Sequence, residues 1–294
     1  LASLSKSTLA QYAKPIRLWW FFCKEKDVDC FAPSVTSFLE FLSLSLTEVG
    51  SYAILNTYRS AISIISTDEI GLHPLIRRFF KGVAFLKPQR PRYDYTWNPS
   101  TVINYLSSLY PHESLSLPKL SRKLITLLAL TTAQRMQTLA AIQIPNIRFS
   151  DSVIIKISSR LKTSGITRSQ PLLSFRSFLD KPELCVFSLL RFYISFTSVL
   201  RRAGNDSLFI SHRAPYGPVS AQTLARWVKL AMSAAGIDIS IFSAHSTRHA
   251  STSFALEEIR RTAGWSSSSE VFARFYNRPI LMNPSFQDMI LSGS

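Results

Sequence analysis

Apolar residues recur at steps of three and four along the first part of the chain, which is the spacing of one face of an α-helix. In the first such stretch the apolar positions include Tyr12, Trp19 and Cys23, and Pro15 would kink or delimit the helix. The expected helices cover Thr8–Lys26, a stretch starting at Pro33, Tyr52–Ile65 and Pro74–Phe85. Residues 1–86 therefore predict a compact bundle of about four helices with basic rims.

The helical pattern breaks between Lys87 and Asn98, where the sequence reads KPQRPRYDYTWN. Two prolines and three basic residues in this stretch predict an extended interdomain linker over residues 87–98. Its charge would let the segment lie along a phosphate backbone, and a plain solvated linker explains the composition equally well. The chain is expected to divide here into two domains.

Beyond residue 98 the helical spacing returns and is interrupted once by a change of period. Alternating positions over Ser152–Ser158 and Gln170–Ser174 predict two short strands, joined by the basic turn RLKTSGITR. The stretch LFIS at Leu208 is a further candidate strand. The expected helices cover Pro99–Leu109, Leu120–Thr131, a stretch from near Gln134, Glu183–Arg201, Ala221–Ala235 and His245–Leu256. The fold class is therefore mainly α, with a small antiparallel sheet in residues 99–294.

The charge of the chain indicates what kind of partner it binds. The 294 residues include 34 Lys and Arg against 18 Asp and Glu, a net charge of +16, and 46% of the residues are apolar. This composition excludes a disordered chain and indicates a polyanion partner, with double-stranded DNA as the leading candidate. We expect no membrane span, because no uninterrupted apolar run reaches about 18 residues, and the first residues do not resemble a signal peptide.

The three cysteines, Cys23, Cys30 and Cys185, match neither a disulfide framework nor a zinc-binding pattern. Free thiols in a reducing compartment are the simpler interpretation. Cytosol or nucleus follows, and we expect the nucleus.

Candidate chemistry lies near the end of the chain. His245 and Arg248 are three residues apart, so one helix face can present an imidazole and a guanidinium to the same small anion. A guanidinium matches two phosphate oxygens, and an imidazole exchanges a proton near neutral pH. Tyr276 lies between Arg274 and Arg278, which suits a phenol that attacks phosphate. Each of these features also occurs on ordinary helix surfaces, so the context must decide between the interpretations.

Five motifs follow one another in the second part of the chain. They are ALTTAQRMQTLAAI, the hairpin lysine in LKTSG, HSTRH, AGW and FYNRP. In this order they resemble the tyrosine recombinases, most closely those of eukaryotic mobile elements of the crypton and DIRS kind. The resemblance covers about residues 120–280, and the helices of residues 1–86 are similar to the core-binding domain of that family. It implies that residues 99–294 form a catalytic domain with a C-terminal tail.

The resemblance assigns a role to one residue in each motif and to two in HSTRH. The matching catalytic positions are Arg135, Lys162, His245, Arg248, Trp265 and Tyr276. Each also has an ordinary interpretation: Arg135 can cap a helix, and Trp265 can belong to the core. Lys156 remains an alternative to Lys162, which is favoured because the sequence KTSG places it at the turn. The competing tyrosines Tyr193 and Tyr216 do not follow the HxxR box.

These residue types fit transfer of a DNA phosphate to a phenol. An unperturbed phenol has a pKa of about 10, so at pH 7 it needs cationic neighbours or a base. Two arginines would stabilise the pentacoordinate transition state by about 3 to 4 kcal/mol each. Lys162, or a water that it holds, would protonate the leaving 5′ oxygen, while His245 would accept the proton of Tyr276 and the Trp265 indole would donate to a phosphate oxygen. The product is a 3′-phosphotyrosyl bond, formed without a metal or another cofactor.

Two domains of this family type would clamp a DNA duplex. The expected DNA-binding residues are Arg59, Arg77, Arg78, Lys81, Arg90, Arg92 and Arg160. The tail Ile280–Leu291 is rich in apolar residues, and in the family a C-terminal helix docks into a neighbouring protomer. The resemblance thus implies a dimer or tetramer on DNA, although the tail can equally pack on its own domain.

Two departures from the family pattern stand out. The family commonly has a carboxylate three residues after the first arginine, where this chain has Thr138, and the connection between Phe254 and Glu258 is short. The leading hypothesis is a recombinase that mobilises a eukaryotic transposable element. The alternatives are a DNA relaxer similar to type IB topoisomerases and a domesticated DNA-binding protein without activity. The complete set of catalytic residue types argues against the last, because a decayed site usually loses one of them.

Overall fold

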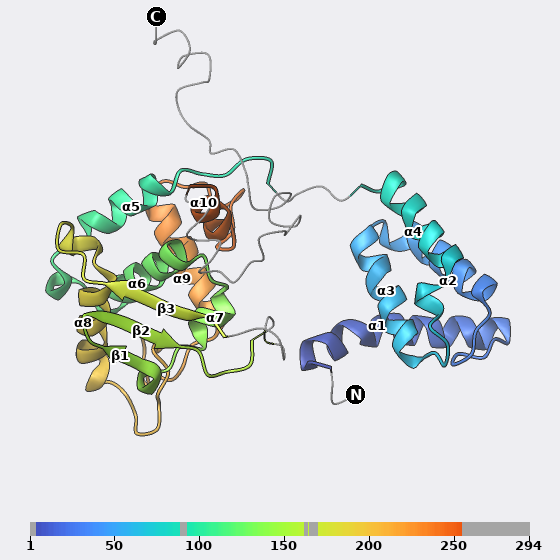
Figure 1. The fold of residues 1–294 in the computed structure, drawn as a ribbon, viewed down its shortest axis with the longest axis horizontal. Coiled ribbons are helices and arrows are strands. Elements are labelled where there is room, and N and C mark those ends of the chain that lie inside the picture. Colours follow the sequence, from blue (N-terminus) through green and yellow to red (C-terminus); the bar gives the residue numbers. More distant parts are fainter. Residues whose placement is uncertain (1–3, 89–92, 162–163, 165–169, 255–294) are drawn as a thin grey trace, which may run out of the picture. The chain divides into compact units, whose positions relative to one another are not determined.

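The computed structural model describes residues 4–88, 93–161, 164 and 170–254 (Figure 1). The chain forms two compact units, Leu1–Pro91 and Arg92–Ser294, and the division falls inside the segment expected as a linker. Each unit has its own hydrophobic core, so each is considered by itself.

The first unit is a helical bundle, as the apolar spacing predicted. Its helices are α1 (Lys6–Lys26), α2 (Val35–Val49), α3 (Tyr52–Ile65) and α4 (Pro74–Leu86). Helix α1 continues through Pro15, so this proline does not delimit it. The second helix begins at Val35 rather than at Pro33, because the Ser34 hydroxyl accepts a hydrogen bond from the Ser37 amide at 3.1 Å and caps the helix.

Aromatic rings fill the core of the first unit. Trp19 is fully buried, stacks on Phe22 with ring centroids 5.5 Å apart and meets Phe38 and Phe41 edge to face. Its indole N–H donates to the Cys30 carbonyl at 3.0 Å, which ties the segment after α1 to the core. Because Phe38 and Phe41 belong to α2, this ring packing holds α1 against α2. The charged face of α4 is exposed to solvent.

The second unit is built around one buried helix. Helix α6 (Leu117–Thr132) is buried nearly all round and packs against every other α-helix of the unit that the structure describes. Those helices are α5 (Pro99–Ser108), α7 (Met136–Ala140), α8 (Val186–Ser198), α9 (Ala221–Ala234) and α10 (Ser246–Phe254). A helix apolar on all faces lies in a core, so α6 sets the frame on which the others are placed.

A three-stranded antiparallel sheet covers one side of this helical core (Figure 1). Its order is β1–β2–β3, with β2 (Ser152–Lys156) paired to β1 (Ile147–Phe149) and to β3 (Leu172–Arg176). The two predicted strands are confirmed, and β1 was missed because three residues are too short to show a period. The Leu208 stretch was predicted wrongly as a strand, since only isolated bridges form there, Gln143 to Ser207 and Ile210 to Pro218.

The helix expected to reach Arg201 ends earlier, at Ser198. The Arg201 guanidinium instead folds back and donates to the Thr197 hydroxyl at 3.0 Å and to the Leu208 carbonyl at 2.5 Å. The guanidinium also donates to the Ser207 carbonyl, so it satisfies two carbonyl groups of a segment that forms no strand. With these corrections the mainly α fold with a small antiparallel sheet is confirmed. None of the described helices is long and apolar enough to cross a membrane.

Candidate active site

Arg135 lies at a sharp turn between two helices. Helix α6 ends at Ala133, which has the left-handed backbone angle φ of 50°, and Arg135 is the N-cap of α7. Its carbonyl accepts from the Thr138 amide at 2.9 Å and the Leu139 amide at 3.1 Å. The backbone of Arg135 is thus fixed by the end of the most buried helix, while its side chain is half-buried.

Thr138 takes the place of the carboxylate that the family usually has. It is 4% exposed, and its uncharged side chain cannot form an ion pair with Arg135. Among the residues described, no carboxylate lies within ion-pair distance of Arg135. The turn therefore fixes the backbone of Arg135, and no described carboxylate pairs with its side chain.

The HSTRH segment enters α10, which packs against α5 and α6. His245 is exposed and lies one residue before the helix, so the expected helix over His245–Leu256 begins a residue late, and the chain after Phe254 lies outside the described residues. Arg248 is 2% exposed, and its amide donates to the His245 carbonyl at 3.2 Å. The box thus pairs an accessible imidazole with a guanidinium held inside the unit.

A hydrogen-bonded loop precedes this box. The Ser246 amide and hydroxyl both donate to the Ser243 carbonyl, at 2.8 and 2.7 Å. The Trp97 indole N–H donates to the Ser246 hydroxyl oxygen at 2.8 Å, and the Tyr93 hydroxyl oxygen accepts from the Ser243 amide at 3.1 Å. Sequence reasoning placed these two aromatics in a linker. No alternating period would have found them, because Tyr95, which is two residues from each, is 36% exposed.

The hairpin after β2 carries both candidate lysines. Lys156 is exposed at the end of β2, and Lys162 lies outside the described residues. Ser164 joins the two sides of the hairpin: its hydroxyl accepts from the Leu161 amide and from the Gln170 side-chain amide, each at 2.7 Å. The residue next to Lys162 is therefore anchored, whereas Lys156 is held by the strand pairing itself.

Four other sequence predictions fall outside the described residues. They are Trp265, Tyr276, the pair Arg90 and Arg92, and the apolar tail Ile280–Leu291. Their assignments stay predictions.

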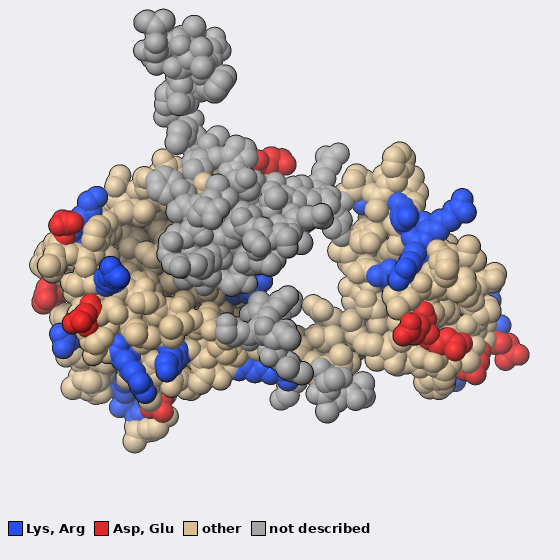
Figure 2. Space-filling view, viewed as in Figure 1, with Lys and Arg blue, Asp and Glu red and all other residues tan. Residues whose placement is uncertain are grey.

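The predicted phosphate-binding residues of the first unit differ from one another. Arg77, Arg78 and Lys81 are exposed on α4, where Figure 2 shows Lys and Arg side chains gathered. Arg59 is half-buried instead, with its guanidinium carbon 4.7 Å from the centroid of the Phe80 ring. Cation–π packing therefore fixes Arg59 beside α4.

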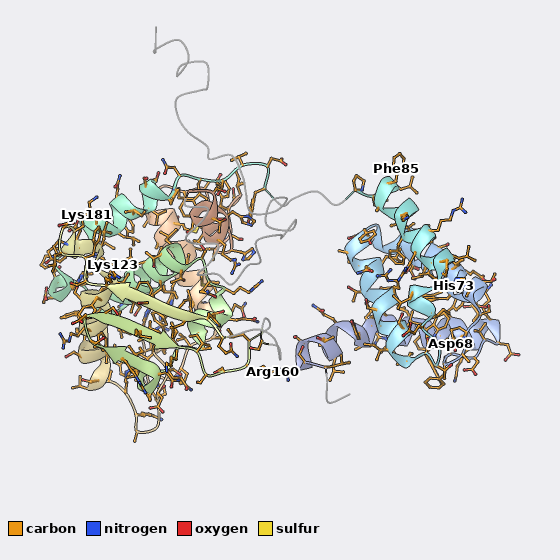
Figure 3. All side chains as sticks on the ribbon, in the orientation of Figure 1. Asp68, His73, Phe85, Lys123, Arg160 and Lys181 are labelled. Atoms are coloured by element: carbon orange, nitrogen blue, oxygen red, sulfur yellow. The ribbon has the colours of Figure 1, made fainter. Side chains whose placement is uncertain are left out.

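The outer face of the sheet carries cations, of which the sequence analysis named Lys156 but not Arg148 or Arg176. Arg148, Lys156 and Arg176 are exposed on it, because Arg148 pairs with Ile154 and Arg176 pairs with Ser152 in one alternating register. Figure 2 shows basic side chains over this sheet. Arg160 is also exposed, at the edge of the unit beyond β2 (Figure 3). Arg148 lies on β1, which is too short to show a period, and Arg176 lies beyond the predicted strand Gln170–Ser174, so the sequence alone did not place them on this face.

Not every cation is free to meet a polyanion. Lys123 is fully buried, and its ammonium donates to the Leu109 carbonyl at 2.6 Å (Figure 3). Burial lowers the pKa of Lys123 to about 8, against the smaller opposing effect of Glu183. The exposed Lys and Arg side chains differ from Lys123 in being open to solvent, and few of them are paired with a carboxylate. Among the described residues, the one ion pair joins Lys26 to Glu40 at 3.0 Å.

The described residues offer no cluster of three His, Cys, Asp or Glu side chains that could hold a metal ion. The half-buried histidine His212 has a different environment. Its ring stacks on Trp227 with centroids 4.0 Å apart, and burial, followed by the charge of Arg122, lowers its pKa to about 4. His212 is therefore neutral at pH 7, when imidazole outside a protein is partly charged.

Comparison with protein families matches residues 106–279 to the Phage integrase family, which is more than half of the chain. This range contains every residue assigned above to catalysis. Comparison with curated protein sequences gives no significant match.

Solved structures share the fold. The XerH site-specific recombinase bound to a palindromic difH substrate, in a post-cleavage complex, is 17% identical, with a TM-score of 0.60 over 97% of this chain and 78% of that chain. A lambda integrase dimer bound to a COC′ core site is 15% identical, with a TM-score of 0.53 over 96% and 92%. The Tn1549 transposon integrase in complex with circular intermediate DNA is 12% identical, with a TM-score of 0.53 over 90% and 86%. At these identities the likeness shows a common fold.

Proposed function

Because the chain belongs to the Phage integrase family, we propose that it is a tyrosine recombinase that cleaves and rejoins specific DNA sites through a 3′-phosphotyrosyl intermediate. One observation carries the proposal. Arg135 begins α7 directly after α6, and Arg248 lies on α10, which packs against α6. The two arginines of the family motifs thus occupy elements fixed to the same buried helix, although 113 residues separate them along the chain (248 − 135).

The chemistry is an exchange of one phosphodiester for another. The Tyr276 oxygen attacks the scissile phosphorus and forms a P–O bond, while the bond from phosphorus to the 5′ oxygen breaks. The phenolic proton passes to His245, and Lys162, or Lys156 in its place, gives a proton to the 5′ oxygen. Arg135 and Arg248 neutralise the phosphate in the transition state. Rejoining reverses these steps with the 5′ hydroxyl of another strand.

The exposure of the described residues suits these roles. His245 is accessible and can receive a proton from a substrate-side group, whereas Arg248 is enclosed, where a charge acts strongly because little water screens it. Arg135 is half-buried at the end of a rigid helix. Donors fixed before the substrate arrives need no reorganisation during the reaction.

DNA binding uses the exposed cations of both units. We propose that Arg77, Arg78 and Lys81 contact phosphates, as do Arg160 and the linker arginines. Arg59 supports this face, because its guanidinium rests on Phe80 of α4. Such contacts release counterions, so binding should weaken steeply with salt.

The biological setting is the finer part of the proposal. The motif order resembles that of recombinases of crypton and DIRS elements, which supports a role in mobilising a eukaryotic transposable element in the nucleus. All three cysteines are free, which suits a reducing compartment. We further propose a dimer or tetramer on DNA, joined through the apolar tail Ile280–Leu291.

The test uses a library of DNA duplexes, each with one nick and randomised flanks. A nick lets the short 5′-hydroxyl fragment diffuse away after cleavage, so the covalent intermediate accumulates. We expect DNA that stays attached to the protein in denaturant, a selected site among the recovered sequences, and no adduct with Tyr276→Phe. DNA retarded in native gels without any adduct would support the silent DNA-binding protein instead.

A second experiment separates recombination from relaxation. Two selected duplexes with different fluorescent labels are mixed with the protein. A recombinase joins one label to the other, whereas an enzyme similar to type IB topoisomerases relaxes supercoiled DNA and rejoins each strand to its own partner.

A further inference from the structure

The chain that enters the second unit runs beside the helix that carries the HSTRH box (Figure 1). Tyr93 and Trp97 lie two and six residues after the boundary between the units, which follows Pro91. They are 6% and 3% exposed, so this part of the predicted linker is packed into the second unit. The strap formed by Tyr93–Trp97 is therefore continuous with the connection between the units at one end and buried against α10 at the other.

Trp97 fixes the residue that follows His245. Its indole N–H donates to the Ser246 hydroxyl oxygen at 2.8 Å, and Ser246 is fully buried. The Ser246 hydroxyl in turn donates a hydrogen bond to the Ser243 carbonyl at 2.7 Å. An indole is a donor only, so this short chain of hydrogen bonds has one direction and one geometry.

Tyr93 fixes the residue two positions before His245. Its hydroxyl oxygen accepts from the Ser243 amide at 3.1 Å and lies 2.7 Å from the Ser243 hydroxyl oxygen, with which it shares a second hydrogen bond. Ser243 is thus held through its amide and its hydroxyl by Tyr93, and through its carbonyl by Ser246. His245 lies between two residues that the strap holds.

The Tyr93 ring reaches the box as well. It lies 5.5 Å from the centroid of Phe242 and meets the His249 ring edge to face at 5.5 Å. His249 in turn meets His245 edge to face at 5.6 Å. Tyr93 therefore supports His245 along two routes, the backbone of Ser243 and the ring of His249.

We propose that Tyr93 and Trp97 are positioning residues for His245 and Arg248, so that this strap of the second unit is part of the catalytic apparatus. This inference rests on the proposed function. His245 is exposed and precedes the first turn of α10, so the helix alone does not set its direction. The strap adds a restraint on each side of His245, and a change in the strap reaches the box through hydrogen bonds to Ser243 and Ser246.

Tyr95 provides a matched control within the same strap. It also packs on Phe242, with ring centroids 5.7 Å apart, yet it is 36% exposed, and no hydrogen bond from its hydroxyl to a described residue is present. Tyr95→Phe therefore removes a hydroxyl from the same strap without touching the two serines.

The experiment measures the cleavage rate at saturating selected DNA, the DNA dissociation constant and the melting temperature for wild type and variants. We expect Tyr93→Phe and Trp97→Phe to slow cleavage about tenfold or more, because small displacements of catalytic groups can cost up to about a hundredfold in rate. Their dissociation constants should stay within about twofold of wild type, and Tyr95→Phe should change nothing. The double variant Trp97→Phe/Ser246→Ala should cleave no more slowly than the slower of its single variants, because one interaction is removed in all three.

A second readout does not depend on activity. In DNA-free protein, the His245 ring resonances should shift in Tyr93→Phe and Trp97→Phe but not in Tyr95→Phe. The proposal is overturned if both variants cleave at the wild-type rate, or if their losses follow lower melting temperatures or weaker DNA binding. If wild type forms no adduct, the proposed function falls and catalytic positioning falls with it. Shifted His245 resonances would in that case still establish the contact between strap and box.

Discussion

The cations of α4 and the arginines of the candidate site are held in opposite ways. On α4, Arg77, Arg78 and Lys81 extend into solvent from a helix whose other face is buried. In the second unit, Arg135 is fixed by a left-handed turn at the end of α6, and Arg248 is 2% exposed on α10. An exposed cation on a long side chain can move with a DNA phosphate, so a neighbouring cation can make the same contact when the first is removed. An enclosed cation acts at one point, and no neighbour can take its place.

The most severe test of this contrast removes the enclosed guanidinium. Arg248→Lys keeps a positive charge but loses the planar fork, and we expect cleavage to fall about 10²- to 10³-fold at saturating DNA, as when one fixed transition-state donor is lost. Single-turnover adduct formation gives the rate. Arg78→Lys on α4 is the control and should cleave at the wild-type rate. Equal losses in both variants would show that enclosure does not distinguish the two kinds of site.

The lysine assignment gives the next largest effect. Loss of the general acid should slow cleavage about 10²-fold or more. A substrate with sulfur in place of the bridging 5′ oxygen needs no protonation, because a thiol has a pKa near 8.5 and leaves as a thiolate. We expect Lys162→Ala to be slow on the normal substrate and restored on the sulfur substrate, while Lys156→Ala is little affected on either. The reverse pattern would assign the role to the exposed lysine of β2.

Removal of the α4 cations should weaken binding without changing the chemistry. The triple variant Arg77→Gln/Arg78→Gln/Lys81→Gln should bind selected DNA about tenfold more weakly at moderate salt, and the slope of log affinity against log salt should fall by about three. Its cleavage rate at saturating DNA should equal that of wild type. A triple variant with Lys14, Arg17 and Lys24 of α1 changed to glutamine would show whether any exposed cations of the unit have the same effect. A slowed chemical step in the α4 variant would contradict the division of roles.

The smallest expected effect is on the pH dependence of the free energy of unfolding, and it comes from His212. His212 has a pKa lowered to about 4 by burial and by Arg122, so the unfolded chain binds a proton more tightly than the folded one. Stability should therefore fall as pH drops from about 6.5 towards 4, by about 1 kcal/mol between pH 7 and pH 5.5. His212→Phe keeps a ring on Trp227 and should remove this part of the pH dependence, measured by denaturant unfolding.

The local spacing of apolar residues predicted most of the helices and strands. Helix α3 covers Tyr52–Ile65 as its apolar spacing predicted, and β2 begins at Ser152 where the period changes. The predictions that were wrong concern segments whose structure is determined by contacts with residues distant in the sequence. Pro15 remains inside α1 because proline removes a single hydrogen bond from a helix that the core still holds. The Leu208 segment has the composition of a strand, but its carbonyls are satisfied by Arg201 rather than by a neighbouring strand.

The candidate site was predictable in its residue types and not in its supports. The HxxR spacing and the order of motifs pointed to His245, Arg248 and Arg135. The bonds from Tyr93 and Trp97 to Ser243 and Ser246 span about 150 residues of chain, and no local periodicity encodes such pairs. A linker composition and a buried strap look alike in sequence until the partner of each aromatic is known.

The central claim is that Tyr276 attacks a phosphate held by these arginines. The most direct measurement is mass spectrometry of the covalent adduct recovered from the nicked library, after digestion with trypsin and nuclease. The account predicts a nucleotide 3′-phosphate joined to the phenolic oxygen of Tyr276, in the peptide that begins at Phe275. Attachment to Tyr193 or Tyr216, or a link through a 5′-phosphate, would contradict it.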